Sequence, residues 1–258
     1  MPKASHSVAF RRSPKRRLIP IYAAILLLVF HTFVVAYINS SFLEQFIDAA
    51  SVGTIYTVGS ALSVLIFLFI SRVLKKVGNL KLTIGLLLIN FAAVLGMSQA
   101  TSLEVAIPLF VVHLIAIPLI VFNLDVFMEE RIGNDESGTG SSRGLLLTLA
   151  SLVGAFSPLI SGLIIGEGGT DFTNAYLVSA LTLIPVLFIL LIFFRRFSDP
   201  EYGEIDLFSA VNTFWANINI RSVFIAQFLL QMFFMMINLT RQNLLVLMMV
   251  KVLKPSIS

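Results

Sequence analysis

Three ionisable side chains lie within or at the end of long apolar segments of this sequence: His31, His113 and Asp125. Such a group costs about 2.5 to 3.5 kcal/mol to insert into a bilayer, so each needs a compensating interaction or a function. His31 lies 13 residues after the start of its segment, and His113 lies 14 residues before Phe127, near the end of its own segment. If these two ends lie on the same side of the bilayer, at about 1.5 Å per helical residue both histidines lie about 20 Å from that side. Imidazole titrates near neutral pH, so two at one depth suit proton coupling or hydrogen bonds to a substrate. The alternative is a pair of neutral histidines, each bonded to a neighbouring carbonyl or to a hydroxyl such as that of Thr32.

Asp125 lies near the end of its segment together with Asn123, and Glu129 and Glu130 follow within about a turn. A carboxylate at that depth suits the binding of a proton or cation in a solute pathway. An ordinary solvated ion pair has the same sequence signature and contributes only about 0 to 1 kcal/mol. Both interpretations stay open. The candidates for a substrate or proton pathway are His31, His113, Asn123 and Asp125.

The segments that must position these residues are long enough to cross a bilayer. Of the 258 residues, 57% are hydrophobic and 12% are charged, and the mean hydropathy is +0.94. A soluble domain carries about a quarter charged residues, so this composition excludes one. A helical span needs about 20 apolar residues. Six runs of that length contain no Lys, Arg, Asp or Glu: 18–38, 51–71, 82–103, 105–124, 144–166 and 172–194.

Basic residues are distributed on one side of these six runs. Fifteen Lys and Arg residues lie in the N-terminal tail and in the segments 72–81, 125–143 and 195–221, and none lies in the intervening loops. Basic loops stay in the cytoplasm, so we expect a multi-pass protein of the cell membrane with a cytoplasmic N-terminus. We attribute the net charge of +4 to this orientation rather than to nucleic-acid binding.

Beyond the sixth run, apolar residues recur at helical spacing between polar ones, which predicts an interfacial amphipathic helix. These residues are Leu207, Phe208, Val211, Phe214, Trp215 and Ile218. A partner-binding helix is the alternative. A seventh uncharged run, 222–240, follows. The expected organisation is a basic cytoplasmic tail (1–17), a six-helix transmembrane bundle (18–196), a cytoplasmic linker with the amphipathic helix (197–221), and a seventh transmembrane helix with an atypical tail (222–258).

Several kinds of chemistry have no sequence signature here. The chain has no cysteine, so it contains no disulfide, thiolate metal site or cysteine nucleophile. It has no Walker loop, no H-E-x-x-H and no G-x-S-x-G. We therefore expect no enzyme activity, no metal and no cofactor.

The turn after the second run, 71–81, is similar to a signature of one transporter family, of the form G-x-x-x-D-R-x-G-R-R. Gly78 and Lys76 match that pattern, and Lys81 lies close to its final basic pair. Lys75 replaces the signature aspartate and Ser71 the first glycine. With its six helices, basic turn and long linker, the chain resembles the N-terminal half of a major facilitator superfamily transporter.

The fifth run carries a second, looser similarity to this family. Residues 153–162 can be aligned with the antiporter pattern G-x-x-x-G-P-x-x-G-G. Pro158 and Gly162 match, and Gly154 lies one place from the first glycine. Small residues let helices approach closely, so a helix-packing face without a coupling role explains this motif equally well.

The resemblance implies two inverted three-helix repeats whose first and fourth helices line a central cavity, with His31 and His113 facing each other across its roof. It also implies a cytoplasmic gate beside Gly78, in which the carboxylates of Asp125, Glu129 and Glu130 pair with Arg72, Lys75 or Lys76. A complete transporter of this family has two such halves. The resemblance therefore implies either a fragment of a longer product or pairing with a second half or copy.

We therefore expect an all-α membrane protein that works as a secondary active transporter of a small solute by alternating access. Its expected partners are the lipid bilayer, the solute and a coupling proton or sodium ion. The alternative is a non-transporting membrane scaffold or an intramembrane enzyme. An oligomeric channel would need a polar stripe along one helix, and no such stripe is present.

Overall fold

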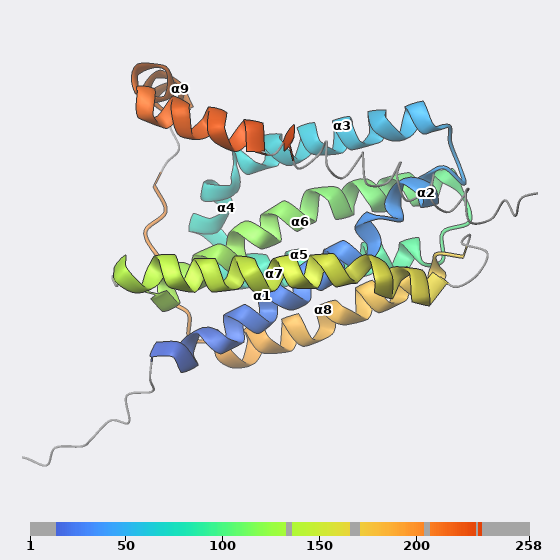
Figure 1. Cartoon of the computed structure of the whole chain (residues 1–258), viewed down its shortest axis with the longest axis horizontal. Coiled ribbons are helices and arrows are strands. Elements are labelled where there is room, and N and C mark those ends of the chain that lie inside the picture. The colour runs from blue at the N-terminus through green and yellow to red at the C-terminus, as the bar shows by residue number, and fades with distance from the viewer. Residues whose placement is uncertain (1–13, 133–135, 166–170, 204–206, 231, 234–258) are drawn as a thin grey trace, which may run out of the picture. The chain divides into compact units, whose positions relative to one another are not determined.

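The computed structural model describes residues 14–132, 136–165, 171–203, 207–230 and 232–233. The chain forms two compact units, Met1–Gly203 and Glu204–Ser258. Within the described residues every regular element is an α-helix, which confirms the all-α prediction (Figure 1).

Six helices of the first unit are long and apolar enough to cross a membrane, which confirms the six predicted spans. They are α1 (Pro14–Ala36), α3 (Ala49–Phe67), α5 (Asn79–Met97), α6 (Leu103–Ile132), α7 (Glu136–Ile165) and α8 (Thr173–Phe193). The apolar parts of α1 and α7 are Leu18–Ala36 and Gly140–Ile165. The chain is therefore built as a polytopic membrane protein.

Two short helices modify the predicted boundaries. The second predicted run is interrupted after Phe67, and α4 (Ile70–Val77) continues from it with the basic residues of the turn. Gly78 follows with φ +83°, a conformation that glycine adopts without strain. This corner lets α5 begin directly at Asn79. On the opposite end, α2 (Asn39–Leu43) lies between α1 and α3.

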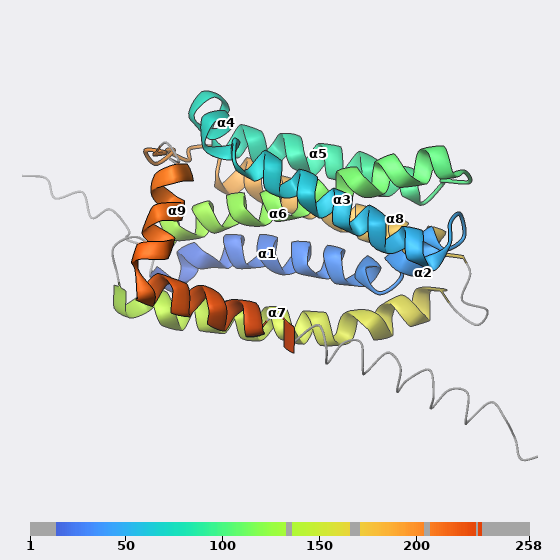
Figure 2. The same cartoon turned by 90° about the horizontal axis from the view of Figure 1, so that it is seen from above.

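The helices pack around a central group of four. α1 packs against α8 and α6, and α5 packs against the same two helices. The remaining long helices lie outside this group, α7 against α1 and α3 against α6 (Figure 2). The four central helices therefore position any side chain that lies at the centre of the bundle.

The core consists mainly of two large apolar clusters, one toward each end of the central helices. One contains Val34, Phe110 and Tyr176, and the other contains Phe127 and Leu190. The outward faces are equally apolar, and their leucines and phenylalanines are widely exposed. An apolar exterior of this kind is stable where lipid tails are the solvent.

The second unit contains α9 (Leu207–Ala216), which begins where the amphipathic helix is predicted. Its Trp215 is exposed and packs edge to face against Phe214. A shorter apolar helix, Ile218–Leu230, follows. It covers the start of the predicted seventh span, 222–240. Residues 234–258 lie outside the described part of the chain, and so do residues 1–13 of the predicted basic tail. The interfacial position of α9 stays a prediction.

Candidate functional site

The two predicted histidines come together at the centre of the bundle. His31 on α1 and His113 on α6 are both buried, and their ring centroids lie 5.6 Å apart. Asn90 of α5 lies between them, and Ser179 of α8 contacts His31 from the other side. Each of the four central helices thus contributes one side chain to a buried polar cluster, consisting of His31, Asn90, His113 and Ser179.

The hydrogen bonds of this cluster are satisfied with both imidazoles neutral. The Asn90 amide nitrogen donates to His31 Nε2 at 3.0 Å, so His31 carries its proton on Nδ1 and donates to the Ser179 carbonyl at 2.8 Å. His113 Nδ1 donates to the Asn90 side-chain oxygen at 2.8 Å. Ser179 Oγ donates to the His31 carbonyl at 2.9 Å. One amide therefore supplies the matching donor and acceptor for both rings.

This geometry differs from the expected cavity roof. The two histidines are enclosed by the central helices, with exposed fractions of 0% and 3%, and neither lines the pocket described below. Thr32, the predicted neighbouring hydroxyl, instead bonds to the carbonyl of Leu28 at 2.9 Å. Asn90 and Ser179 were not among the sequence candidates. The sequence feature that could have identified Asn90 is its position as a polar residue inside the apolar run 82–103. The proton-pathway role of the histidines stays a prediction.

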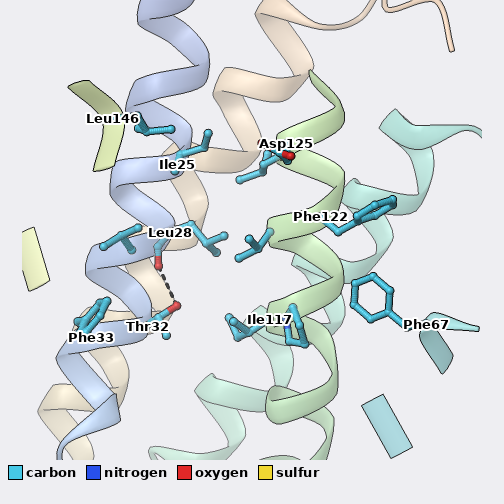
Figure 3. Close-up of a pocket in the computed structure, with 13 residues that line it drawn as sticks. Ile25, Leu28, Thr32, Phe33, Phe67, Ile117, Phe122, Asp125 and Leu146 are labelled. Atoms are coloured by element: carbon cyan, nitrogen blue, oxygen red, sulfur yellow. Dashed lines mark hydrogen bonds between the residues drawn. The ribbon is translucent and has the colours of Figure 1, made fainter. Parts of the chain in front are cut away.

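A pocket of about 650 Å³ opens between α1 and α6. Its lining comes mainly from one face of each helix, with Phe67 of α3 and Leu146 of α7 at its margins (Figure 3). Among the described residues that line it, the polar side chains are Thr32 and Asp125. The Thr32 hydroxyl is already bonded within its own helix. Of the lining residues within the described part of the chain, Asp125 is therefore the one ionisable group that the pocket presents to a ligand.

The lining residues follow the helical repeat. On α1 they are Ile25, Leu28, Val29, Thr32 and Phe33, and on α6 they are Ile117, Pro118, Val121, Phe122, Leu124 and Asp125. Spacings of three and four residues place each set on one face of its helix. Sequence reasoning missed this face, apart from Asp125, because both helices carry apolar residues on their other faces as well.

Asp125 belongs to a cluster of three charged side chains at one end of the bundle. Arg143 of α7 lies 3.4 Å from Asp125 Oδ2 through Nη2, and the same nitrogen contacts Glu129 more closely. The three side chains are about half exposed, at 50% for Asp125, 42% for Arg143 and 51% for Glu129. Arg143 of α7 thus bridges Asp125 and Glu129, two carboxylates expected in the gate. Arg143 itself was not a sequence candidate.

The other predicted gate residues make different contacts. Glu130 pairs with Arg131, whose guanidinium also donates to the Phe193 carbonyl at 2.9 Å. Arg72 lies over the ring of Phe69, the residue that precedes α4. Arg72, Lys75 and Lys76 are carried by α4, and Gly78 forms the corner after it. The gate itself stays a prediction, and Arg143 is the partner that the structure gives Asp125 and Glu129.

Asn123 lies between the lining residues Phe122 and Leu124 in the sequence but does not line the pocket, and it is fully buried. Its backbone carbonyl accepts a bond from the Asn79 amide at 3.0 Å, whereas both polar atoms of its own side chain have no hydrogen-bond partner among the described residues. Asn79 in turn begins α5, and its backbone N–H donates to Asp199 Oδ1 at 2.7 Å. Asn123 therefore belongs to a contact that joins α6 to the start of α5, and not to the pocket lining.

The small residues of α7 form the contact with α1. A Cβ placed on Gly154 would lie 3.4 Å from the ring of Phe33, and Ser161 Oγ donates to the carbonyl of Val34. Pro158 lies inside a continuous helix. Gly162 differs from the expected packing role because a Cβ there would meet nothing within 4 Å. Ser161 takes its place at the interface because it lies on the same face as Gly154, seven residues away.

Comparisons with known proteins give no further identification. No protein-family model, curated protein or solved structure matches this chain. Among the described residues, no group of three or more His, Cys, Asp or Glu side chains is placed to hold a metal ion.

Proposed function

We propose that this chain is one six-helix module of a secondary transporter of the major facilitator type, which moves a small solute by alternating access. The observation that carries the proposal is the pocket between α1 and α6, an apolar hollow of about 650 Å³ with one carboxylate. This volume lies within the range of small-molecule sites, about 300 to 1,000 Å³. A membrane scaffold has no need of such a hollow.

The helix contacts support an arrangement of two inverted three-helix repeats. Exchanging α1 with α6, α3 with α7 and α5 with α8 maps the principal contacts onto one another. The contact of α1 with α7 becomes that of α6 with α3, and the contact of α1 with α8 becomes that of α6 with α5. Internal symmetry of this kind is typical of transporters, whose substrate sites lie at the interface of the repeats.

The charge distribution supports a cytoplasmic N-terminus in the cell membrane. Arg131 of α6 donates to the Phe193 carbonyl of α8, and Asn79 at the start of α5 donates to Asp199. These contacts bring several basic helix ends together. These ends carry Arg72, Lys75, Lys76, Lys81, Arg131, Arg143, Arg195 and Arg196. The opposite loops, 37–48, 98–103 and 171–172, carry no Lys or Arg. Basic loops face the cytoplasm.

In this proposal the module works with a second half or a second copy, which closes the pocket from its open side. A proton or sodium gradient supplies the driving force, and the protein itself performs no chemical reaction on the solute. Arg143 bridges Asp125 and Glu129 at the basic end, so it joins these carboxylates as a gate residue.

Cysteine accessibility tests alternating access directly, because the chain has no cysteine of its own. Thr32→Cys places the sole thiol in the pocket lining. Membrane-impermeant methanethiosulfonate reagents are then applied to right-side-out and to inside-out vesicles of the host membrane. Alternating access predicts modification from both sides, since the pocket opens to each side in turn.

Ala24→Cys is the matched control on the same helix, because Ala24 is fully buried and lies outside the pocket. It should stay unmodified from either side. Modification of Thr32→Cys from one side only would contradict alternating access. Modification from neither side would favour the scaffold interpretation.

A further inference from the structure

The chemistry of the pocket between α1 and α6 restricts the ligands that it can hold. Aromatic rings of Phe33, Phe67 and Phe122 contribute to the lining, and the remaining side chains are aliphatic apart from Thr32 and Asp125. A strongly hydrated solute such as a sugar would lose its hydrogen bonds to water here, at a cost that the lining does not repay. The pocket therefore suits a ligand with a large apolar surface.

The charge at one end of the pocket restricts the ligand further. Asp125 and Glu129 contribute two negative charges and Arg143 contributes one positive charge, so the cluster carries a net charge of −1. An anion placed beside Asp125 would be repelled, whereas a cation would be attracted. The faces of aromatic rings also attract cations.

The ion pair of Arg143 with Asp125 is weak enough for a ligand to replace it, because both side chains are about half exposed and such pairs contribute only about 0 to 1 kcal/mol. The separation of Nη2 from Asp125 Oδ2 is 3.4 Å, longer than the 2.7 to 2.9 Å of a good charge-assisted hydrogen bond. The same nitrogen contacts Glu129 more closely. Arg143 can therefore keep Glu129 as its partner while Asp125 turns to a cation in the pocket, so no charge is left without a partner.

We infer that the pocket between α1 and α6 binds a lipophilic organic cation, with Asp125 as its counter-ion and Arg143 as an internal competitor for that carboxylate. As a statement about the transported substrate, this rests on the proposed function, whereas binding itself does not. A bulky cation whose charge is spread over apolar groups loses less hydration free energy on burial than a compact ion does. Such a cation therefore gains from both the lining and Asp125.

Tetraphenylphosphonium is a suitable probe because tetraphenylborate has nearly the same shape and the opposite charge. The full chain is placed in lipid nanodiscs, and binding of each radiolabelled ion is measured by equilibrium dialysis, with empty nanodiscs subtracted. We expect saturable binding of the cation and at least tenfold weaker binding of the anion. Equal binding of the two ions would overturn the inference.

Two substitutions should change the affinity in opposite directions. Asp125→Asn should weaken binding of the cation at least tenfold, and Arg143→Gln should strengthen it several-fold by removing the competitor. Glu104→Gln, an exposed acid at the other end of α6, should change the affinity less than twofold. Because one effect is a gain, misfolding of a variant cannot produce the whole pattern. Unchanged affinity in both variants would overturn the inference.

The outcome can be separated from that of the proposed function. Two-sided modification of Thr32→Cys without binding of the cation would remove the ligand class and leave alternating access standing. Binding of the cation together with modification of Thr32→Cys from one side only would remove alternating access and leave the ligand class standing.

Discussion

The rings of His31 and His113 meet edge to face at the centre of the bundle, with their centroids 5.6 Å apart and Asn90 hydrogen-bonded to both. The cluster joins α1, α5 and α6, and Ser179 extends it to α8. It thereby specifies how these helices align, because sliding one helix by a residue would break its bonds in an apolar surrounding. The arrangement of the central helices therefore depends on a few polar atoms.

Replacing Asn90 with leucine should destabilise the bundle. Asn90→Leu keeps the side-chain volume similar but leaves His31 Nε2 and His113 Nδ1 without their partner. An unsatisfied buried polar group costs about 1 to 3 kcal/mol. A hydrogen bond between membrane helices contributes about 0.6 kcal/mol on average, and Asn90→Leu removes two of them. We expect a loss of about 1 to 3 kcal/mol in the free energy of unfolding, measured by denaturant titration in micelles. The exposed neighbour Ile89 supplies the control, since Ile89→Leu should leave stability unchanged. Equal stability of Asn90→Leu and the parent protein would show that the cluster does not hold the helices.

The close approach of α7 to α1 can be tested with two glycines on the same helix. Gly154→Leu places a side chain against the Phe33 ring, whereas Gly162→Leu points into open space. Overpacking at a helix contact typically costs about 1 to 3 kcal/mol. We therefore expect Gly154→Leu to lower the unfolding temperature and Gly162→Leu to leave it unchanged. If both variants melt alike, α7 does not pack on α1 through this face.

The segment after α8 is expected to stabilise the start of α5 through Asp199 and to do so in a pH-dependent way. Asp199 Oδ1 accepts bonds from the Asn79 N–H and the Tyr202 hydroxyl, both at 2.7 Å. Partial burial, the hydrogen bond to Asp199 and the negative charge of Asp199 raise the pKa of Tyr202 above its ordinary value of about 10. A raised pKa means that this contribution to stability is complete below about pH 10 and is lost as the pH rises toward the pKa of the folded state.

Difference titration of tyrosinate absorbance checks this expectation, with Tyr202→Phe used to assign the signal. Asp199→Asn should lower the pKa of Tyr202, because it removes the negative charge and the anionic acceptor. It should also cost about 1 kcal/mol in the free energy of unfolding, as expected for loss of a charged acceptor at a helix start. Glu201→Gln, an exposed acid close by, should change neither quantity. An unaltered titration in Asp199→Asn would contradict the assigned contact.

Membrane orientation follows from two single cysteines at opposite ends of the bundle. Ser41 lies in α2 and Glu201 lies in the segment after α8, and both are exposed. We expect an impermeant maleimide to label Ser41→Cys in intact cells and Glu201→Cys only after permeabilisation. Labelling in the reverse pattern would invert the proposed orientation.

The sequence alone was sufficient to predict the six spans. A bilayer imposes its demand on each segment separately, since any 20-residue stretch without charges can be solvated by lipid as a helix. The predicted runs and the observed helices therefore agree to within a few residues, with three exceptions. The second run is interrupted after Phe67, α5 ends at Met97, six residues before the end of its predicted run, and α6 and α7 extend beyond their apolar runs. The same reasoning identified His31, His113 and Asp125 as exceptional, because their cost depends on residue type and depth alone.

Only the tertiary structure decided which face of each helix is buried. Leu163 and Leu190 both lie in apolar helices, yet Leu163 is 84% exposed and Leu190 is 0% exposed. In a soluble protein the polar face of a helix marks its exterior, but a helix in lipid can be apolar on every side, so its sequence carries no such contrast. The choice of Asn90 as the partner of both histidines, and of Arg143 as the partner of Asp125, depends on helices brought together from distant parts of the chain. Those contacts follow from packing, which the composition of a single segment does not encode.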